Sequence, residues 1–254
     1  MKKKLPYVRS KWNKTQPLLA HESLRPHIPK TFKLSEPSLQ AVLDEFGIAY
    51  MKPDIGTYGQ GVMRAEKIQP EEGPAEFVLF SGTNRYSFKT VSSLYETLLH
   101  RKLKRSYLVQ QGIDLLTYNG RLLDVRVMVQ IGPDGPWEST GVIGRLAAPH
   151  KVVTNYHNGG TPLPLEALLQ PFLDEQQIGA YRDLLYTLGR NTAEAMAAAY
   201  PAIHMLGIDV GIDVQMKPWI IEVNTKPDVF IFKVLEDKTM YNKIYQYAKR
   251  LGKV

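Results

Sequence analysis

The sequence contains no cysteine among its 254 residues. This absence excludes disulfide bonds, cysteine-ligated zinc and a cysteine nucleophile, and it is in keeping with a reducing compartment. No window approaches the ~18 to 20 consecutive apolar residues that a membrane-spanning helix needs. The basic start, Met1 to Lys4, has no apolar stretch after it and therefore does not resemble a signal peptide. We expect a cytoplasmic protein with no membrane partner.

Internal repeats and low-complexity segments are also missing. The composition, 44% hydrophobic and 22% charged, is that of an ordinary globular protein and disfavours disorder. The net charge of +7 and the pI of about 9.3 favour anionic partners such as nucleotides, phosphates, acidic chains or nucleic acid. Nucleic acid is the weakest of these partners, because no nucleic-acid motif is present and the aromatic residues are not interleaved with the basic runs.

Residues 206–228 carry the clearest pattern of polar residues. Apolar and polar positions alternate on both sides of a short turn, which predicts a hairpin of two strands, each buried on one face. A turn at residues 215–218 would place Gly211 opposite Glu222. The residues expected to share the polar face are Asp209, Gly211, Asp213, Glu222 and Asn224.

Crowded carboxylates on this face repel one another unless a positive charge lies between them. Ligands that offer only oxygen suit a hard cation such as Mg²⁺, which takes few carboxylates and completes its shell with phosphates and water. The alternative is a solvated polar face on an exposed sheet, but the apolar residues that flank each carboxylate disfavour it. The hairpin therefore predicts a magnesium site.

A second pattern joins a lysine to a glycine-rich segment. A strand is expected at residues 48–53, and Lys52 near its end could reach phosphates held by residues 54–62. A run rich in glycine can curl around phosphates with its N–H groups pointing inward. No Gly-Lys-Ser/Thr follows, and a strand comes next where a Rossmann fingerprint has a helix. An ordinary glycine hairpin remains the alternative. The glycines concerned are Gly56, Gly59 and Gly61.

Two further strands carry polar residues in unusual places. The strand at residues 107–111 ends in two glutamines and either offers backbone amides to an adenine edge or simply runs into a loop. The strand at residues 122–131 is apolar apart from Asp124 and Arg126, which need partners if they are buried. Either these two neutralise each other, or the arginine faces a transferring phosphoryl group. Arg145 lies on the next predicted strand.

The remaining pattern predicts helices and loops. Residues 1–34 are basic and contain proline, which suggests an ordered arm. The loop at residues 154–160 contains His157, which we interpret as a surface or core histidine in preference to a catalytic one. Helices are expected at residues 37–46, 91–103, 165–173, 175–200 and 240–251.

The order of these features along the chain resembles the ATP-grasp superfamily, and most closely its YheC/YheD family of endospore coat-associated proteins. The tubulin-tyrosine-ligase and ribosomal-S6-glutamate-ligase branches are similar at a greater distance. The resemblance extends from about Ser10 to Pro227. The matching segments are Lys52-Pro53, Gly56 to Gly61, Val109 to Ile113, Asp124-Val125-Arg126, Thr154-Asn155 before Gly159-Gly160, Gly207 to Asp209 and Glu222 to Asn224.

This resemblance implies an α+β fold in which two α/β lobes with antiparallel sheets sandwich the nucleotide. It also implies that the N-terminal pre-ATP-grasp domain is absent or truncated, because only about 50 residues precede Lys52. The expected division is a basic arm at residues 1–34, a small lobe with the glycine-rich loop at residues 35–110, and a large lobe at residues 111–254.

The resemblance also implies roles for individual residues. Arg126 and Arg145 would stabilise the transferred phosphoryl group or hold the carboxylate substrate. The spacing to Glu222 favours Asp209 over Asp213 as a magnesium ligand, so the implied metal ligands are Asp209, Glu222 and Asn224. The implied ATP-binding residues are Lys52, Gly56, Gly59, Gly61, Gln110, Gln111, Gly112, Asp124 and Asn155.

The implied activity is ATP- and Mg²⁺-dependent ligation of a carboxylate to an amine or thiol through an acyl phosphate. The carboxylate and the acceptor stay undefined, with an acidic peptide or a spore-coat protein among the partners considered. The alternative is a catalytically silent ATP-binding structural protein of the spore surface.

Overall fold

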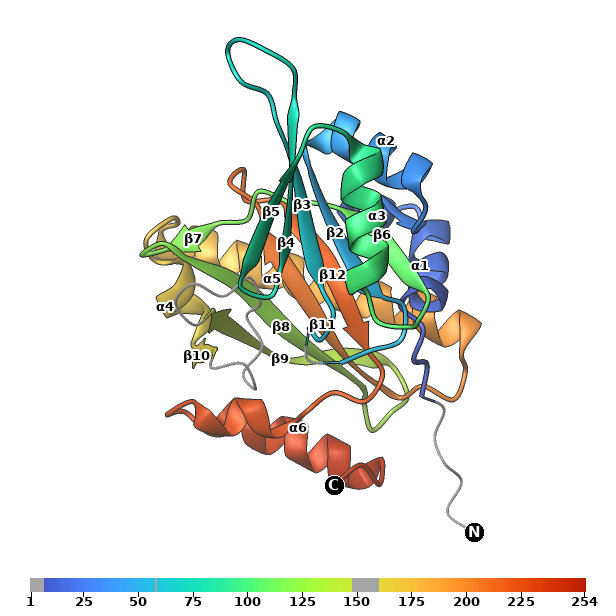
Figure 1. Ribbon diagram of the computed structural model, residues 1–254. Helices are drawn as coiled ribbons and strands as arrows, with labels where there is room; N and C mark the ends of the chain where they lie inside the picture. The colour runs from blue at the N-terminus through green and yellow to red at the C-terminus, as the bar shows by residue number, and fades with distance from the viewer. Residues whose placement is uncertain (1–6, 58, 148–159) are drawn as a thin grey trace. The chain divides into compact units, whose positions relative to one another are not determined.

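The computed structural model describes residues 7–57, 59–147 and 160–254 (Figure 1). The chain divides into two compact units. The large unit consists of the described residues of Met1–Ile28 and Leu115–Val254, and the small unit consists of those of Pro29–Asp114. The α+β architecture expected from the sequence is confirmed, since each unit combines an antiparallel sheet with helices.

The small unit is an antiparallel sheet in the order β1-β6-β2-β3-β4-β5 with two helices packed against it. Helices α2 (Glu36–Phe46) and α3 (Val91–Arg101) bury their apolar faces on the strands, where Leu43 and Leu98 belong to the same core as Met51. The strands are β1 (Thr31–Lys33), β2 (Ile48–Pro53), β3 (Met63–Ile68), β4 (Glu76–Ser81), β5 (Asn84–Phe88) and β6 (Tyr107–Gln111).

Helix α2 begins and ends at residues that the sequence marks clearly. The Ser35 side chain accepts a hydrogen bond from the backbone N–H of Ser38, and the Ser38 hydroxyl oxygen accepts in return from the backbone N–H of Ser35, which forms a capping box. Pro37 lies in the first turn, and Gly47 closes the helix with φ of 72°. These local signals explain why the sequence located this helix almost to the residue.

The large unit is a second antiparallel sheet, in the order β10-β9-β8-β11-β12, with β7 paired to β8. Its helices are α1 (Lys11–Ala20), α4 (Leu165–Leu169), α5 (Glu175–Ala199) and α6 (Thr239–Arg250), with short 3₁₀ turns η1 (Arg25–His27) and η3 (Phe230–Val234). The strands are β7 (Thr117–Tyr118), β8 (Arg121–Ile131), β9 (Trp137–Leu146), β10 (Thr161–Leu163), β11 (Met205–Ile212) and β12 (Pro218–Asn224). Among the described residues, none of the helices has both the length and the apolar character that a bilayer span requires.

Alternate residues of β8 point to different cores. Val127 belongs to the core that includes α5, whereas Met128 belongs to the one that includes α6 and η3. Because side chains alternate across a strand, Asp124 and Arg126 lie on the same face as Met128. Figure 1 shows α5 and α6 on opposite sides of this sheet. The alternation places the polar residues of β8 on the face opposite α5.

The structure has one helix that was not predicted, and another that ends earlier than predicted. The segment expected to be an arm contains helix α1, whose start is capped by the Ser10 side chain. Helix α4 ends at Leu169, earlier than the predicted residue 173. Pro171 has no N–H to continue the helical hydrogen bonds, although Gln170 before it keeps helical backbone and the N–H groups of Phe172 and Leu173 still donate to the carbonyl of Leu169.

The predicted hairpin exists, but its register differs from the prediction. Asp209, and not Gly211, lies opposite Glu222, while Gly211 lies opposite Trp219. The strands reverse earlier than predicted, since Ile212 already pairs with Pro218, and a β-bulge between Asp209 and Val210 then shifts the pairing by one residue. Directly opposed residues share a face, so the bulge brings the Asp209 and Glu222 side chains to the same face of the sheet.

Asp213 holds the turn of this hairpin. Its Oδ1 accepts hydrogen bonds from the backbone N–H groups of Gln215 and Lys217, both at 2.9 Å. Its Oδ2 accepts a bond from the indole Nε1 of Trp219 at 2.8 Å. The carboxylate that sequence reasoning kept as a further metal candidate therefore satisfies three donors of its own turn.

We expect Asp213→Ala to lower the free energy of unfolding by about 2–3 kcal/mol, because it leaves three donors of the turn without their acceptor, at bonds that are partly buried. Asp213→Asn should cost less, since the amide oxygen can still accept from the turn while the amide nitrogen cannot accept from Trp219. Urea denaturation followed by tryptophan fluorescence measures both values. Asp134→Ala, at an exposed position, is the control. Equal stability of Asp213→Ala and the control would contradict this role.

Candidate functional site

A buried network of ion pairs crosses three adjacent strands of the large unit. Arg126 on β8 donates from Nε to Oδ1 of Asp209 on β11 at 2.6 Å. Arg145 on β9 donates from Nε and Nη2 to the two oxygens of Asp124 at 2.7 and 2.5 Å. The same Nη2 lies 2.9 Å from Oδ1 of Asp209. The sequence left open whether Asp124 and Arg126 neutralise each other; in the structure Arg126 pairs with Asp209, and Asp124 pairs with Arg145.

The strand register explains this pairing. Asp209 lies opposite Arg126 in the β11–β8 ladder, and Asp124 lies opposite Arg145 in the β8–β9 ladder. A buried guanidinium keeps its charge only with a hydrogen-bonded anion beside it. The strand register therefore fixes the orientation of both guanidinium groups, because it places the carboxylate partner of each directly opposite on the neighbouring strand.

The ion pairs favour the charged forms of Asp209 and Arg145 through their pKa values. Burial alone would raise the pKa of Asp209, but Arg126, Arg145 and the amide of Asn224 hold it below its usual value. Burial acts to lower the pKa of Arg145, whereas Asp124 and Asp209 raise it above its usual value. The site thus contains fixed full charges in a water-poor environment, where they interact strongly with any ligand charge.

Gly207 leaves room for the Arg126 side chain, because it has no side chain of its own. A Cβ atom at Gly207 would lie 2.6 Å from the Cβ of Pro227 and 3.1 Å from Nη1 of Arg126. A side chain there would have to displace the proline or the guanidinium. The glycine is therefore explained by close packing beside the ion pairs.

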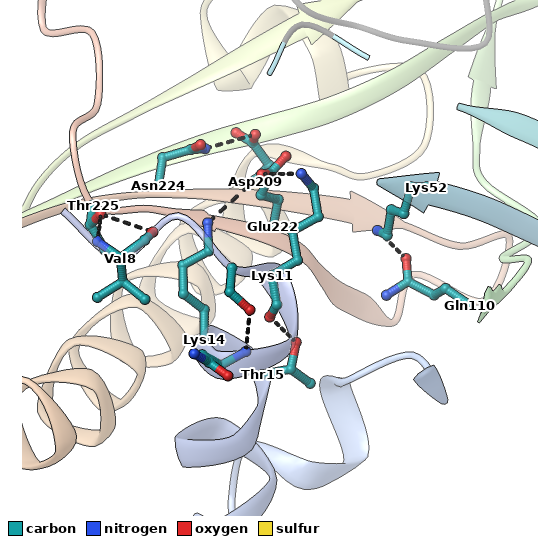
Figure 2. A network of polar contacts seen from close by, with 12 residues as sticks. Val8, Lys11, Lys14, Thr15, Lys52, Gln110, Asp209, Glu222, Asn224 and Thr225 are labelled. Carbon is teal, nitrogen blue, oxygen red and sulfur yellow. Dashed lines mark hydrogen bonds and ion pairs between the residues drawn. The ribbon is translucent and has the colours of Figure 1, made fainter. Parts of the chain in front are cut away.

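The predicted magnesium ligands lie together at the hairpin, but all three are already engaged by other side chains. Asn224 donates from Nδ2 to Oδ2 of Asp209 at 3.1 Å. Glu222 faces two ammonium groups of helix α1, with Lys11 Nζ at 3.5 Å and Lys14 Nζ at 3.8 Å from its Oε1 (Figure 2). The described part of the chain contains no group of three His, Cys, Asp or Glu residues that could hold a metal ion.

These residues nevertheless suit Mg²⁺ in their chemistry. Mg²⁺ is usually bound through one or two carboxylates together with substrate phosphates, and it does not need a cage of protein ligands. Glu222 is the more accessible of the two carboxylates, with a side chain 30% exposed against 8% for Asp209. Asp209 and Asn224 add hard oxygen atoms beside it, although Asp209 shares its oxygens with Arg126, Arg145 and Asn224.

In the small unit, the predicted phosphate lysine is positioned by a chain of hydrogen bonds. Lys52 donates from Nζ to Oε1 of Gln110 at 2.6 Å (Figure 2). Gln110 donates from Nε2 to the hydroxyl of Thr31 at 2.8 Å, and Thr31 donates to the carbonyl of Pro29 at 2.9 Å. The Gln110 residue is only 7% exposed. Its side chain therefore supports Lys52, a role that the sequence did not suggest.

The other β6 residues expected at the nucleotide lie at the end of that strand. Gln111 accepts a bond from the backbone N–H of Lys30 through its side-chain oxygen at 3.1 Å. The N–H of Gly112 donates to the carbonyl of Ile48 at 2.8 Å. Both contacts tie the end of β6 to neighbouring backbone within the small unit.

The glycine-rich segment follows β2, as predicted, and leads into β3. Gly59 and Gly61 adopt φ of 68° and 74°, in the left-handed region that favours glycine. A Cβ atom at Gly61 would also lie 2.6 Å from the hydroxyl oxygen of Tyr107, which donates to the Gly61 carbonyl at 2.9 Å. Gly61 is thus required by both backbone and packing, whereas Gly56 has no such requirement.

One predicted nucleotide residue lies outside the described part of the chain. Asn155 and the neighbouring His157 belong to residues 148–159, which the structure does not describe. Conversely, sequence reasoning missed the two lysines of α1. The available signal was Ser10 as an N-cap before a lysine pair at i and i+3, which places both side chains on one helix face.

Comparison with known proteins extends these observations. A family model described as YheC/D-like ATP-grasp matches residues 5–251. The chain is 22% identical over 218 residues to the endospore coat-associated protein YheC of Bacillus subtilis (strain 168), covering 85% of this chain and 59% of that protein. It is 24% identical over an alignment of 263 residues to YheD of the same organism, covering 96% of this chain and 54% of that protein. The chain therefore spans somewhat more than half the length of these curated relatives.

Solved structures show the same fold. The crystal structure of D-cycloserine synthetase DcsG aligns with a TM-score of 0.58 at 13% identity, covering 96% of this chain and 70% of that one. N5-carboxyaminoimidazole ribonucleotide synthetase from Thermotoga maritima aligns with a TM-score of 0.50 at 12% identity, covering 95% of this chain and 49% of that one. At these identities the likeness establishes the fold alone. Together with the family match over nearly its whole length, it shows that the chain belongs to the YheC/D-like ATP-grasp family.

Proposed function

We propose that the chain is an ATP- and Mg²⁺-dependent ligase that joins a carboxylate to an amine or thiol. The observation that carries this proposal is the pair of buried arginines, Arg126 and Arg145, held in place by Asp124 and Asp209 beside the accessible Glu222. Preorganised charges of this kind stabilise a transferring phosphoryl group at no cost of reorientation. Membership of an ATP-grasp family supports the assignment of ATP as the phosphoryl donor.

The proposed reaction has two steps. An oxygen of the substrate carboxylate attacks the γ-phosphorus of ATP, which forms an acyl phosphate and releases ADP. The amine or thiol then attacks the acyl carbon and releases inorganic phosphate. No protein nucleophile is needed, which suits a chain without cysteine.

Each predicted residue has a part in this proposal. Lys52 holds phosphate oxygens, and Arg126 with Arg145 neutralises charge as the phosphoryl group moves. The glycine-rich segment, Gln111 with Gly112, Asp124 and Asn155 complete the nucleotide contacts. Asp209, Glu222 and Asn224 would hold Mg²⁺, which neutralises phosphate charge when bound.

A catalytically silent ATP-binding protein is the second candidate. The observation in its favour is that both arginines already have carboxylate partners and that Glu222 already faces two lysines. The two curated relatives are named as endospore coat-associated proteins. For either candidate we propose a location in the cytoplasm or at the spore coat, with acidic peptides or coat proteins as partners.

Turnover distinguishes the two candidates. We expect acceptor-stimulated release of phosphate when the protein is incubated with ATP, Mg²⁺ and a panel of amino acids and acidic peptides. Arg126→Lys should lower the stimulated rate by about 100-fold or more, because lysine cannot reproduce the fixed planar guanidinium, which bonds Asp209 through Nε and keeps other N–H donors for a ligand. Bound ATP with no stimulation by any acceptor would favour the silent candidate.

Glu222→Gln should weaken ATP binding at least about ten-fold in the presence of Mg²⁺, because it removes the charged ligand that the metal needs. In EDTA the same variant should bind ATP no more weakly than the wild type. Isothermal calorimetry in both buffers measures the difference. Glu138→Gln is the matched control, since Glu138 also pairs with a lysine, Lys243. Equal loss in both buffers would argue against a metal role.

Gln110→Met should weaken ATP binding by roughly ten-fold, because it removes the bond that positions Lys52, while adenosine binding should not change. Lys52→Met should weaken ATP binding by at least as much. If Gln110 acts through Lys52, the double variant should bind ATP no more weakly than Lys52→Met alone. Lys67→Met, which breaks the ion pair with Asp44, is the control in the same unit. Additive losses would show that Gln110 acts independently.

A further inference from the structure

The glycine-rich segment, residues 54–62, is tied at its start to the connection that leads from α3 to β6. The N–H of Asp54 donates to the carbonyl of Ser106 at 2.9 Å, in line with the pairing of β2 and β6. Nη1 of Arg105 donates to the carbonyl of Ile55 at 3.3 Å. Two neighbouring residues of the connection therefore hold the first two residues of the segment.

Tyr107 joins the two ends of the same segment. Its backbone lies opposite Pro53, the last residue of β2 before the segment begins. Its hydroxyl donates to the carbonyl of Gly61 at 2.9 Å, close to the end of the segment, and accepts from the N–H of Leu103 at 3.1 Å. A tyrosine hydroxyl can donate one hydrogen bond and accept another, so both partners are served at once. This one residue therefore sets the spacing between the start and the end of the segment.

Tyr107 has little freedom to move. The residue is 5% exposed, and its ring belongs to the core of the small unit together with Met51. Lys102 lies over the ring, with Nζ 5.3 Å from the ring centroid, and also donates to the carbonyl of Arg105 at 3.0 Å. Because core side chains are closely packed, the hydroxyl is presented to Gly61 from a fixed point.

The hydroxyl of Tyr107 fixes the turn in which the segment ends. The N–H of Val62 donates to the carbonyl of Gly59 at 3.2 Å, which closes a turn of residues 59–62. Gly61 has φ of 74° in this turn, and a Cβ atom there would lie 2.6 Å from the hydroxyl oxygen of Tyr107. In a trans peptide the carbonyl and the following N–H point in opposite directions. The peptide between Gly61 and Val62 is therefore held on both sides, by Tyr107 and by Gly59.

From these contacts we propose that Tyr107 is a positioning residue, whose hydroxyl holds the glycine-rich segment in the conformation that receives the phosphates of a nucleoside triphosphate. This inference rests on the proposed function and deepens it, because it names the group that prepares the phosphate site. A segment that is ordered before binding loses less conformational entropy when the ligand arrives. Tyr107 acts through Gly61, and Arg105 secures the start of the same segment.

The test uses the full chain, removes the hydroxyl and keeps the ring. Tyr107→Phe leaves the aromatic ring in the core. Tyr86→Phe is the matched control, since Tyr86 packs against the same core and its ring centroid lies 4.2 Å from the guanidinium carbon of Arg101. Arg105→Met removes the bond to Ile55, with Arg101→Met as the control for the lost charge. Thermal unfolding of every variant defines a temperature at which all of them are folded.

Two measurements are made at that temperature. Hydrogen–deuterium exchange of the ligand-free protein follows peptides that cover residues 54–63, and calorimetry measures the binding of ATP and of adenosine. We expect Tyr107→Phe to exchange at least about three-fold faster in these peptides and to bind ATP roughly three- to ten-fold more weakly, because a hydrogen bond that orders the segment is lost. Adenosine binding should stay as in the wild type. Arg105→Met should show the same pattern beyond any effect of Arg101→Met.

The inference requires both effects in Tyr107→Phe. Wild-type affinity for ATP in this variant overturns it, and so does an equal loss of ATP and adenosine affinity, which indicates a structural role. A loss specific to ATP without faster exchange also overturns it, because the hydroxyl would then not act through the segment. If the wild-type protein binds no ATP, the proposed function itself fails. If the wild type and Tyr86→Phe bind ATP and Tyr107→Phe binds it equally well, only the positioning role fails.

Discussion

The ion pair between Arg126 and Asp209 is the interaction on which the rest of the large unit's polar site depends. A guanidinium and a carboxylate inside a sheet are tolerated only when they meet with good geometry and their other groups are also bonded. Asp209 also accepts from Arg145 and Asn224, and Arg145 also donates to Asp124, so the other groups of the pair are bonded as well. Four charged residues on strands β8, β9 and β11, together with Asn224 on β12, thus form a single network. The strand register sets the direction in which each of these side chains points.

This network changes the interpretation of the acidic hairpin. From the sequence alone, the carboxylates of the hairpin need a cation to offset their mutual repulsion. In the structure, protein cations already compensate them: arginines at Asp209, and lysines of α1 at Glu222. The basic balance of the chain is therefore partly concentrated at the site.

Much of the fold followed from local signals. The capping box at Ser35 and the glycine at Gly47 located α2 closely, and the alternation in β8 located a strand that is polar at Asp124 and Arg126 on one face. Predictions of element ends and strand pairing failed where a single residue or a contact with a distant part of the chain determined the structure. Pro171 shortened α4. The hairpin reverses earlier than predicted, and the extra residue of the bulge places Ile220 and Val223, three residues apart, in the same core, which period-two alternation does not predict.

The sequence by itself determined the kinds of residue available, their order and the family resemblance, because these depend on spacing along the chain. The tertiary structure alone decided the partners. Arg126 pairs with Asp209 and not with Asp124, and Gln110 accepts a hydrogen bond from Lys52. Lys11 and Lys14 of helix α1 form ion pairs with Glu222. These pairs are far apart in sequence, and a charge at a given position says only that it needs a counter-charge. Which counter-charge it meets depends on strand register and helix packing, and these are properties of the folded chain as a whole.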